Sequence, residues 1–174
     1  MTLISGKIRS SIFAMVGAGA YCLTIIRCQL QGRAIELPNY TLLEPGLFIG
    51  GACTNPPPNT RAVLNLSSHL DDYTVEEYRW QPLHSGVAPT LQWLREQVDF
   101  IDSCRRAGKA IFVHCDAGID RSASVVAAYL MWHKHITSDA AIELVQRKRA
   151  VARPSPMFLR LLNEWQAVQG TSVF

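Results

Sequence analysis

One segment of the chain constrains its fold and chemistry more than any other. It is the polar stretch HCDAGIDRS, His114 to Ser122, which joins two apolar runs. The short run before it, 110–113, predicts a buried strand, and the run after it, 122–133, predicts a buried helix. A strand, a tight loop and a helix N-terminus favour bound anions, because the loop N–H groups and the helix dipole attract negative charge.

The side chains at the two ends of this loop indicate a nucleophile aimed at a bound phosphate. Converging N–H groups, the helix dipole and Arg121 all favour the thiolate form of Cys115. The planar fork of Arg121 suits two phosphate oxygens and their transition state. We expect the backbone N–H groups between these ends to bind the phosphate, from Asp116, Ala117, Gly118, Ile119, Asp120 and Arg121.

Three further residues of the stretch have predicted supporting roles. Gly118 permits a loop conformation that a side chain would obstruct. Ser122 is placed to donate a hydrogen bond to the sulfur when a phosphocysteine breaks down, and His114 is expected to orient the loop through hydrogen bonds to its carbonyls. The alternative, an inert buried thiol at Cys115, would leave Arg121 as an unexplained charge at a helix start.

The composition sets limits on the rest. With 174 residues, 48% apolar and 18% charged, the chain fits one globular domain rather than a disordered one. Its net charge of +3 comes without a Lys/Arg stripe, so nucleic acid is not an expected partner. The five widely spaced cysteines indicate neither a zinc site nor a disulfide scaffold, and favour a reducing compartment on the cytosolic side. No metal or other cofactor is expected.

The first 38 residues differ from the remainder. Residues 10–26 carry no charge, and at seventeen residues they are at the short end for a membrane-spanning helix, about 17–25. A membrane anchor is the favoured interpretation. A soluble packed helix and a signal peptide are alternatives. Gln31 to Pro38 is predicted to be a linker, and residues 39–170 the globular domain.

Within that domain, strands alternate with helices. Apolar patterning predicts strands near 47–49, 62–66, 78–83 and 110–113. Helices are expected from Thr90 to about Arg106, over 122–133, from 137 to about 149, and from 155 onward. The predicted fold is therefore a single α/β domain. Its mainly parallel, twisted sheet of four to five strands has helices on both faces.

The signature and its continuation, RSASVVAAYLMW, resemble the cysteine-dependent protein tyrosine phosphatase superfamily, and in particular its dual-specificity branch. The resemblance extends over about 40–168, through Pro45–Gly50, 63–66 and the RPSPMF segment at 153–158. It implies a two-step, metal-free hydrolysis through a phosphocysteine. The short chain further implies a shallow pocket.

One position departs from the family pattern. The family supplies an Asp general acid about 30 residues before the Cys, and here Ser85 occupies that position. Asp120 is the favoured replacement, since related lipid phosphatases of the myotubularin and Sac types also carry Asp before the signature Arg. His84 is one alternative, because the ordinary pKa of a histidine, about 6.5, suits an acid at neutral pH, and Asp71 or Asp72 is another. Without a dedicated acid the enzyme is slower on poor leaving groups by about 10²–10⁴-fold.

Charge in and near the loop bears on the substrate. Tensin-related phosphoinositide phosphatases have Lys where this chain has Asp116 and Ile119, which disfavours a polyphosphorylated head group. The basic residues 147–149 and 153 are predicted to be a solvated helix end, with contact to an anionic surface as the alternative. Whether Cys53 or Cys104 pairs with oxidised Cys115 is left open by the sequence.

Three functions follow from this reading of the residues. The leading one is a phosphatase acting on phosphoprotein, at Tyr or at Ser/Thr. A membrane-associated phospholipid monophosphate phosphatase is the second, and a phosphate-binding pseudophosphatase the third.

Overall fold

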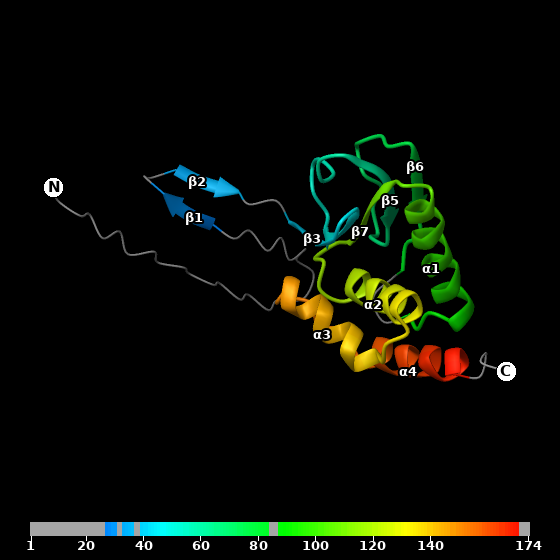
Figure 1. The fold of residues 1–174 in the computed structure, drawn as a ribbon. Coiled ribbons are helices and arrows are strands. Elements are labelled where there is room, and N and C mark those ends of the chain that lie inside the picture. The colour runs from blue at the N-terminus through cyan, green and yellow to red at the C-terminus, as the bar shows by residue number, and fades with distance from the viewer. Residues whose placement is uncertain (1–26, 31–32, 37–38, 84–86, 171–174) are drawn as a thin grey trace.

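The structure, a computed structural model, describes residues 27–30, 33–36, 39–83 and 87–170. The predicted apolar helix at 10–26 lies outside these ranges, as do His84 and Ser85. Across the ranges that are described, no helix is both long and apolar enough to span a bilayer. Within the stretch predicted to be a linker, β2 (Arg33–Glu36) pairs antiparallel with β1 (Arg27–Leu30) in a two-stranded sheet apart from the main one (Figure 1).

The domain is built on a five-stranded sheet in the order β3-β4-β7-β5-β6. Its strands are β3 (Tyr40–Glu44), β4 (Leu47–Gly51), β5 (Thr60–Asn65), β6 (Glu77–Trp80) and β7 (Ala110–Cys115). The last four are mutually parallel, while β3 and β4 form an antiparallel hairpin. Its turn contains Gly46, at a positive φ of 75° that glycine adopts without strain. The predicted mainly parallel sheet is confirmed, with β3 as an unpredicted edge strand.

Strand β7 lies at the centre of the sheet, and all its residues after Ala110 are buried. This position explains its unbroken apolar run, since a central parallel strand is covered on both faces. In register, Cys115 pairs with Gly51 of β4, and His114 pairs with Asn65 of β5. The carboxyl ends of the three central strands therefore meet at one edge of the sheet, where ligands bind in open α/β sheets.

Four helices begin and end close to their predicted limits. They are α1 (Leu91–Arg106), α2 (Arg121–Lys134), α3 (Ser138–Lys148) and α4 (Pro156–Gly170). The Thr90 hydroxyl accepts the Trp93 N–H at 3.1 Å as the N-cap of α1, and Thr137 caps α3 in the same way. Gly108, with φ +68°, follows the end of α1.

The helices of the described chain share a single apolar core with one face of the sheet (Figure 1). That face carries Ile49, Leu64, Ile111 and Val113, and the helices add Leu94, Val98, Ile101, Val125, Phe158 and Leu162. Phe112, on the other face, stacks on the His114 ring at 4.8 Å between centroids. The prediction of helices on both faces is thus met on one face only within the described part of the chain.

Candidate active site

The loop between β7 and α2 has its backbone fixed from outside. Every carbonyl from Asp116 to Ile119 accepts a hydrogen bond from a neighbouring segment, and the Asp120 carbonyl accepts the first helical bond of α2 from the Ser124 N–H at 2.9 Å. The four outside donors, in that order, are the Ala52 N–H, Arg149 Nη2, Arg149 Nε and the Arg153 N–H, at 3.1, 3.2, 2.7 and 2.7 Å. In a trans peptide the N–H points opposite to the carbonyl. The N–H groups of this loop therefore turn inward, which makes an anion cradle.

Cys115 lies at the start of the cradle and is 2% exposed. Its Sγ accepts the Gly118 N–H at 3.3 Å and lies 3.4 Å from the Ser122 hydroxyl. That hydroxyl is 3.1 Å from the Gly50 carbonyl, so its one proton is available either to that oxygen or to the sulfur. The sulfur thus lies beside the serine that the sequence predicts to assist it, and the Gly118 N–H is a further contact that the sequence did not predict.

Arg121 is the first residue of α2, and hydrogen bonds to the protein orient its guanidinium toward the same site. Nη1 donates to the carbonyls of Leu66 at 2.9 Å and Leu83 at 3.0 Å, at the ends of two neighbouring segments. Nη2 is paired with the carboxylate of Asp116. A phosphate that binds the arginine fork must therefore share Nη2 with Asp116 or displace it, which the sequence did not predict.

His114 is fully buried, but its ring does not bond the loop carbonyls as predicted. Nε2 lies 2.9 Å from Asp71 Oδ2 and 3.4 Å from the Tyr73 hydroxyl. Burial by itself raises the pKa of Asp71, but hydrogen bonds from His114, Tyr78 and Tyr73 and the His114 charge outweigh it and lower that pKa. Asp71 is therefore a carboxylate held behind the strand, which argues against the predicted alternative of Asp71 as the general acid.

Asp120, the favoured acid, occupies the N-cap position of α2 but makes no capping hydrogen bond. Its Oδ1 accepts the Ser155 N–H at 2.7 Å, which ties the loop to the start of α4. A protonated carboxyl keeps such a bond through its carbonyl oxygen and carries the proton on the other oxygen. The contact is thus compatible with bracing and with proton donation. Asp72 is exposed.

Arg149 belongs to the site, although the sequence predicts a solvated helix end for it. It is 8% exposed and makes two of the hydrogen bonds that hold the loop carbonyls, rather than ending a helix in solvent. The neighbouring Arg147 does behave as predicted, with an exposed side chain that faces Glu143. In the sequence the two belong to one basic run, separated only by Lys148, and no local signal distinguishes them.

The other cysteines whose side chains are described are poor nucleophiles. Burial and the charge of Asp71 raise the pKa of Cys53 to about 11, and burial and Glu77 raise the pKa of Cys104 to about 12. Their sulfurs bond the Asn55 carbonyl and the Glu77 carboxylate respectively. No cluster of three or more His, Cys, Asp or Glu suited to a metal ion occurs among the described residues.

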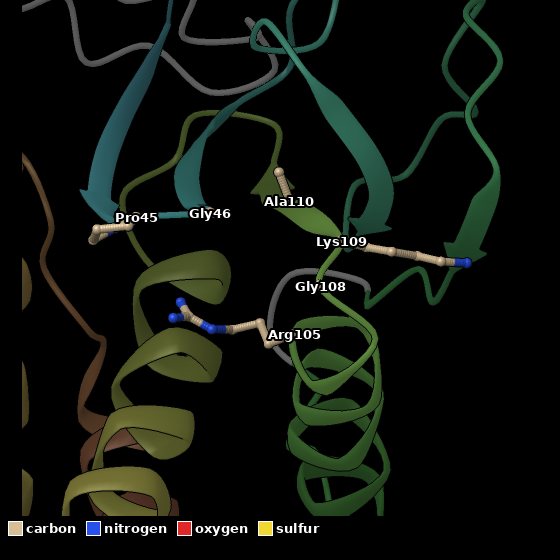
Figure 2. Close-up of a pocket in the computed structure, with 6 residues that line it drawn as sticks. All are labelled: Pro45, Gly46, Arg105, Gly108, Lys109 and Ala110. Atoms are coloured by element: carbon tan, nitrogen blue, oxygen red, sulfur yellow. The ribbon is translucent and has the colours of Figure 1, made fainter.

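A pocket of about 190 Å³ lies at the other edge of the sheet, where β7 begins. Figure 2 shows its two basic side chains, Arg105 and Lys109, pointing away from each other. Lys109 pairs with Glu77, and Arg105 lies 3.7 Å from Glu44. Since these cations diverge and have acidic neighbours, the pocket does not form a second anion site.

Comparison with known proteins places this geometry in context. The sequence model for the dual specificity phosphatase catalytic domain matches residues 56–168. Human dual specificity protein phosphatase 1 is 33% identical over 109 residues, which cover 61% of this chain and 30% of that protein. The Slingshot homolog of Xenopus laevis is 31% identical over 113 residues, 63% of this chain and 16% of that protein. The match thus spans less than a third of either relative.

Solved structures share the fold. The crystal structure of human DUSP28 covers 77% of this chain and 97% of its own, with a TM-score of 0.70 and 25% identity. The structure of PTPMT1 in complex with PI(5)P covers 78% of this chain and 99% of its own, with a TM-score of 0.68. At 24% identity, the likeness to PTPMT1 concerns the fold alone.

Proposed function

Because the chain belongs to the family of dual specificity phosphatase catalytic domains, we propose that it hydrolyses phosphate monoesters of proteins through a phosphocysteine at Cys115. The observation that carries this proposal is the cradle. Four consecutive loop carbonyls, from Asp116 to Ile119, turn outward to external donors, and Cys115 Sγ lies at the base of the cradle with the Gly118 N–H directed at it. Such a preorganised set of donors stabilises an anion and the charge that develops during its transfer.

In the first step, Cys115 Sγ attacks phosphorus, an S–P bond forms, and the ester O–P bond breaks. Arg121 follows the equatorial oxygens, since its guanidinium is already oriented by the Leu66 and Leu83 carbonyls. The leaving oxygen takes a proton from the general acid. Asp120 is the proposed donor, with His84 as the alternative.

In the second step, water attacks phosphorus, an O–P bond forms and the S–P bond breaks, returning the electron pair to sulfur. The proton of the water passes to the group that acted as the acid in the first step, proposed to be Asp120, which restores it for the next turnover. The Ser122 hydroxyl, 3.4 Å from Sγ, moves its hydrogen bond from the Gly50 carbonyl to the forming thiolate. Hydrogen bonds to charged groups contribute about 1.5–3 kcal/mol, so this one accelerates the breakdown of the intermediate.

A phospholipid monophosphate is the second candidate substrate. The observation that favours it is a set of exposed apolar side chains on loops that flank the site: Leu70, Val87 and Val151 are 60%, 52% and 42% exposed. They follow β5, β6 and α3, and the apolar segment 10–26 would bring the domain to a membrane. A pseudophosphatase is the third candidate, suggested by Ser85.

A substrate panel tests these proposals. The full chain in EDTA is assayed on an aryl phosphate, on phosphotyrosine and phosphothreonine peptides, and on a lipid monophosphate in vesicles. We expect turnover that is lost in Cys115→Ser, with the peptides favoured over the lipid. Preference for vesicles would replace the protein substrate with a lipid. Binding of inorganic phosphate without turnover of any substrate would indicate a pseudophosphatase.

A further inference from the structure

Arg149 lies behind the cradle as a deeply buried guanidinium. It follows α3 directly and makes four hydrogen bonds. Nε donates to the Gly118 carbonyl at 2.7 Å, and Nη2 to the Ala117 carbonyl at 3.2 Å and to Asn39 Oδ1 at 2.7 Å. Nη1 lies 3.4 Å from the Thr41 hydroxyl. The arginine thus joins the phosphate loop to the start of the domain and fixes both.

One peptide group connects Arg149 to the sulfur of Cys115. The peptide between Ala117 and Gly118 gives its carbonyl to Arg149 and its N–H to Cys115 Sγ, at 3.2 and 3.3 Å. A cation on the carbonyl side polarises the amide, and hydrogen bonds in such a chain strengthen one another. Arg149 therefore both aims this N–H and makes it a better donor to a thiolate.

The absence of a side chain at Gly118 allows Arg149 to approach the loop this closely. Its φ is +69°, and a Cβ built on it would come within 2.4 Å of Arg149 Nη2 and 2.3 Å of the Gly50 carbonyl carbon. A side chain here would push the guanidinium away from the loop. The glycine of the signature is thus needed both for its backbone conformation and for the close approach of Arg149.

We propose that Arg149 is a positioning residue which, through the peptide groups after Ala117 and Gly118, holds the cradle in shape and keeps Cys115 as a thiolate. This inference rests on the proposed function. It assigns the site two cations, Arg121 in front of the loop and Arg149 behind it. In support, burial lowers the pKa of Arg149 while the nearby Cys115 charge raises it.

The other charged groups around the sulfur are held in place by their own partners. Arg121 pairs with Asp116 in front of the loop, and Asp120 accepts the Ser155 N–H. His114 lies against Asp71 behind the strand. Within the described part of the chain, the hydrogen bonds of Arg149 go to other groups than these side chains. Its replacement therefore leaves their charges in place, and a change at Cys115 reports on Arg149 itself.

The test is the pH profile of Cys115 alkylation in the full chain. Iodoacetamide, a neutral reagent, is reacted at a series of pH values, and the Cys115 peptide is quantified by mass spectrometry. Arg149→Gln should raise the midpoint by about one pH unit, making alkylation below the midpoint about tenfold slower. Arg149→Lys should lie between, since it keeps the charge but loses the planar fork. The matched control Arg147→Gln removes an equal charge from a side chain that is 61% exposed, and should leave the profile unchanged.

A second variant keeps the proposal testable if Arg149→Gln does not fold. Asn39→Asp places a carboxylate against Nη2 without altering Arg149 or the loop, and should raise the midpoint by less than the glutamine change does. A folded Arg149→Gln or Asn39→Asp chain with the wild-type profile would overturn the proposal. Alkylation needs no turnover, so a shifted profile in a chain that hydrolyses nothing would sink the proposed function and leave this inference standing.

Discussion

Replacing Asp116 with Asn should tighten the binding of phosphate-like anions. In the structure the Asp116 carboxylate engages Nη2 of Arg121, the arginine proposed to grip the substrate phosphate. An arriving phosphate meets both a competitor for that nitrogen and a like charge in the same loop. The amide of Asn is nearly isosteric and uncharged, so it removes the repulsion and weakens the competition.

The exposure of the pair sets the size of the effect. The side chains of Arg121 and Asp116 are 14% and 29% exposed, between a solvated pair and a buried one. Exposed ion pairs contribute about 0.2–1 kcal/mol and breaking buried ones costs about 3–5 kcal/mol. An intermediate value of about 1–2 kcal/mol corresponds to an affinity gain of roughly 5- to 30-fold for the anion.

Isothermal titration calorimetry with inorganic phosphate measures this directly, in wild-type and Asp116→Asn protein at two ionic strengths. Asp99→Asn is the matched control, because it removes the same charge from an exposed position on α1. We expect tighter binding in Asp116→Asn alone, with a smaller gain at high salt. Unchanged or weaker phosphate binding in Asp116→Asn would refute the competition between Asp116 and the substrate.

Three further predictions concern other residues of the site. Asp120→Asn keeps an acceptor for the Ser155 N–H but has no carboxyl proton to donate. Turnover of alkyl phosphates should therefore fall by about 10²–10⁴-fold, while activated aryl phosphates are spared. Equal losses on both substrates would remove Asp120 from the acid role. Ser122→Ala should slow phosphocysteine breakdown by about 10- to 100-fold, so that a pre-steady-state burst of aryl alcohol appears. An unchanged steady-state rate would contradict the role of Ser122. Because the pKa of Asp71 is lowered in the folded state, its ionised form stabilises the fold at neutral pH, and this contribution disappears as the pH falls below about 4. Asp71→Asn should therefore unfold at lower urea concentration than wild type at pH 7, with the gap closing in acid, whereas a gap independent of pH would contradict the lowered pKa.

Local signals in the sequence were enough to predict much of this fold. Thr90 and Gly108 mark the ends of α1, and an unbroken apolar run marks β7 as the central strand. The order of apolar strand, polar loop and apolar helix placed Cys115 and Arg121 correctly on either side of the loop. These features depend on residues that are neighbours in the chain, which is why patterning detects them.

What the sequence did not reveal depends on contacts between distant segments. Arg149 bonds Gly118 and Asn39, which are 31 and 110 positions away, and this distinguishes it from Arg147 only once the chain has folded. The His114 partner, Asp71, comes from the loop after β5, 43 positions earlier. Local patterning carries no information about such pairs, so a buried arginine and a solvated one look the same.

The central claim is that Cys115 carries the phosphoryl group during turnover. The most direct test quenches the full chain during hydrolysis of an aryl phosphate, in the presence of EDTA, and analyses its peptides by mass spectrometry. The mechanism predicts one added phosphoryl group on the Cys115 peptide, more of it in Ser122→Ala, and none in Cys115→Ser. Hydrolysis by Cys115→Ser at the wild-type rate, or a phosphoryl group on another residue, would contradict the claim.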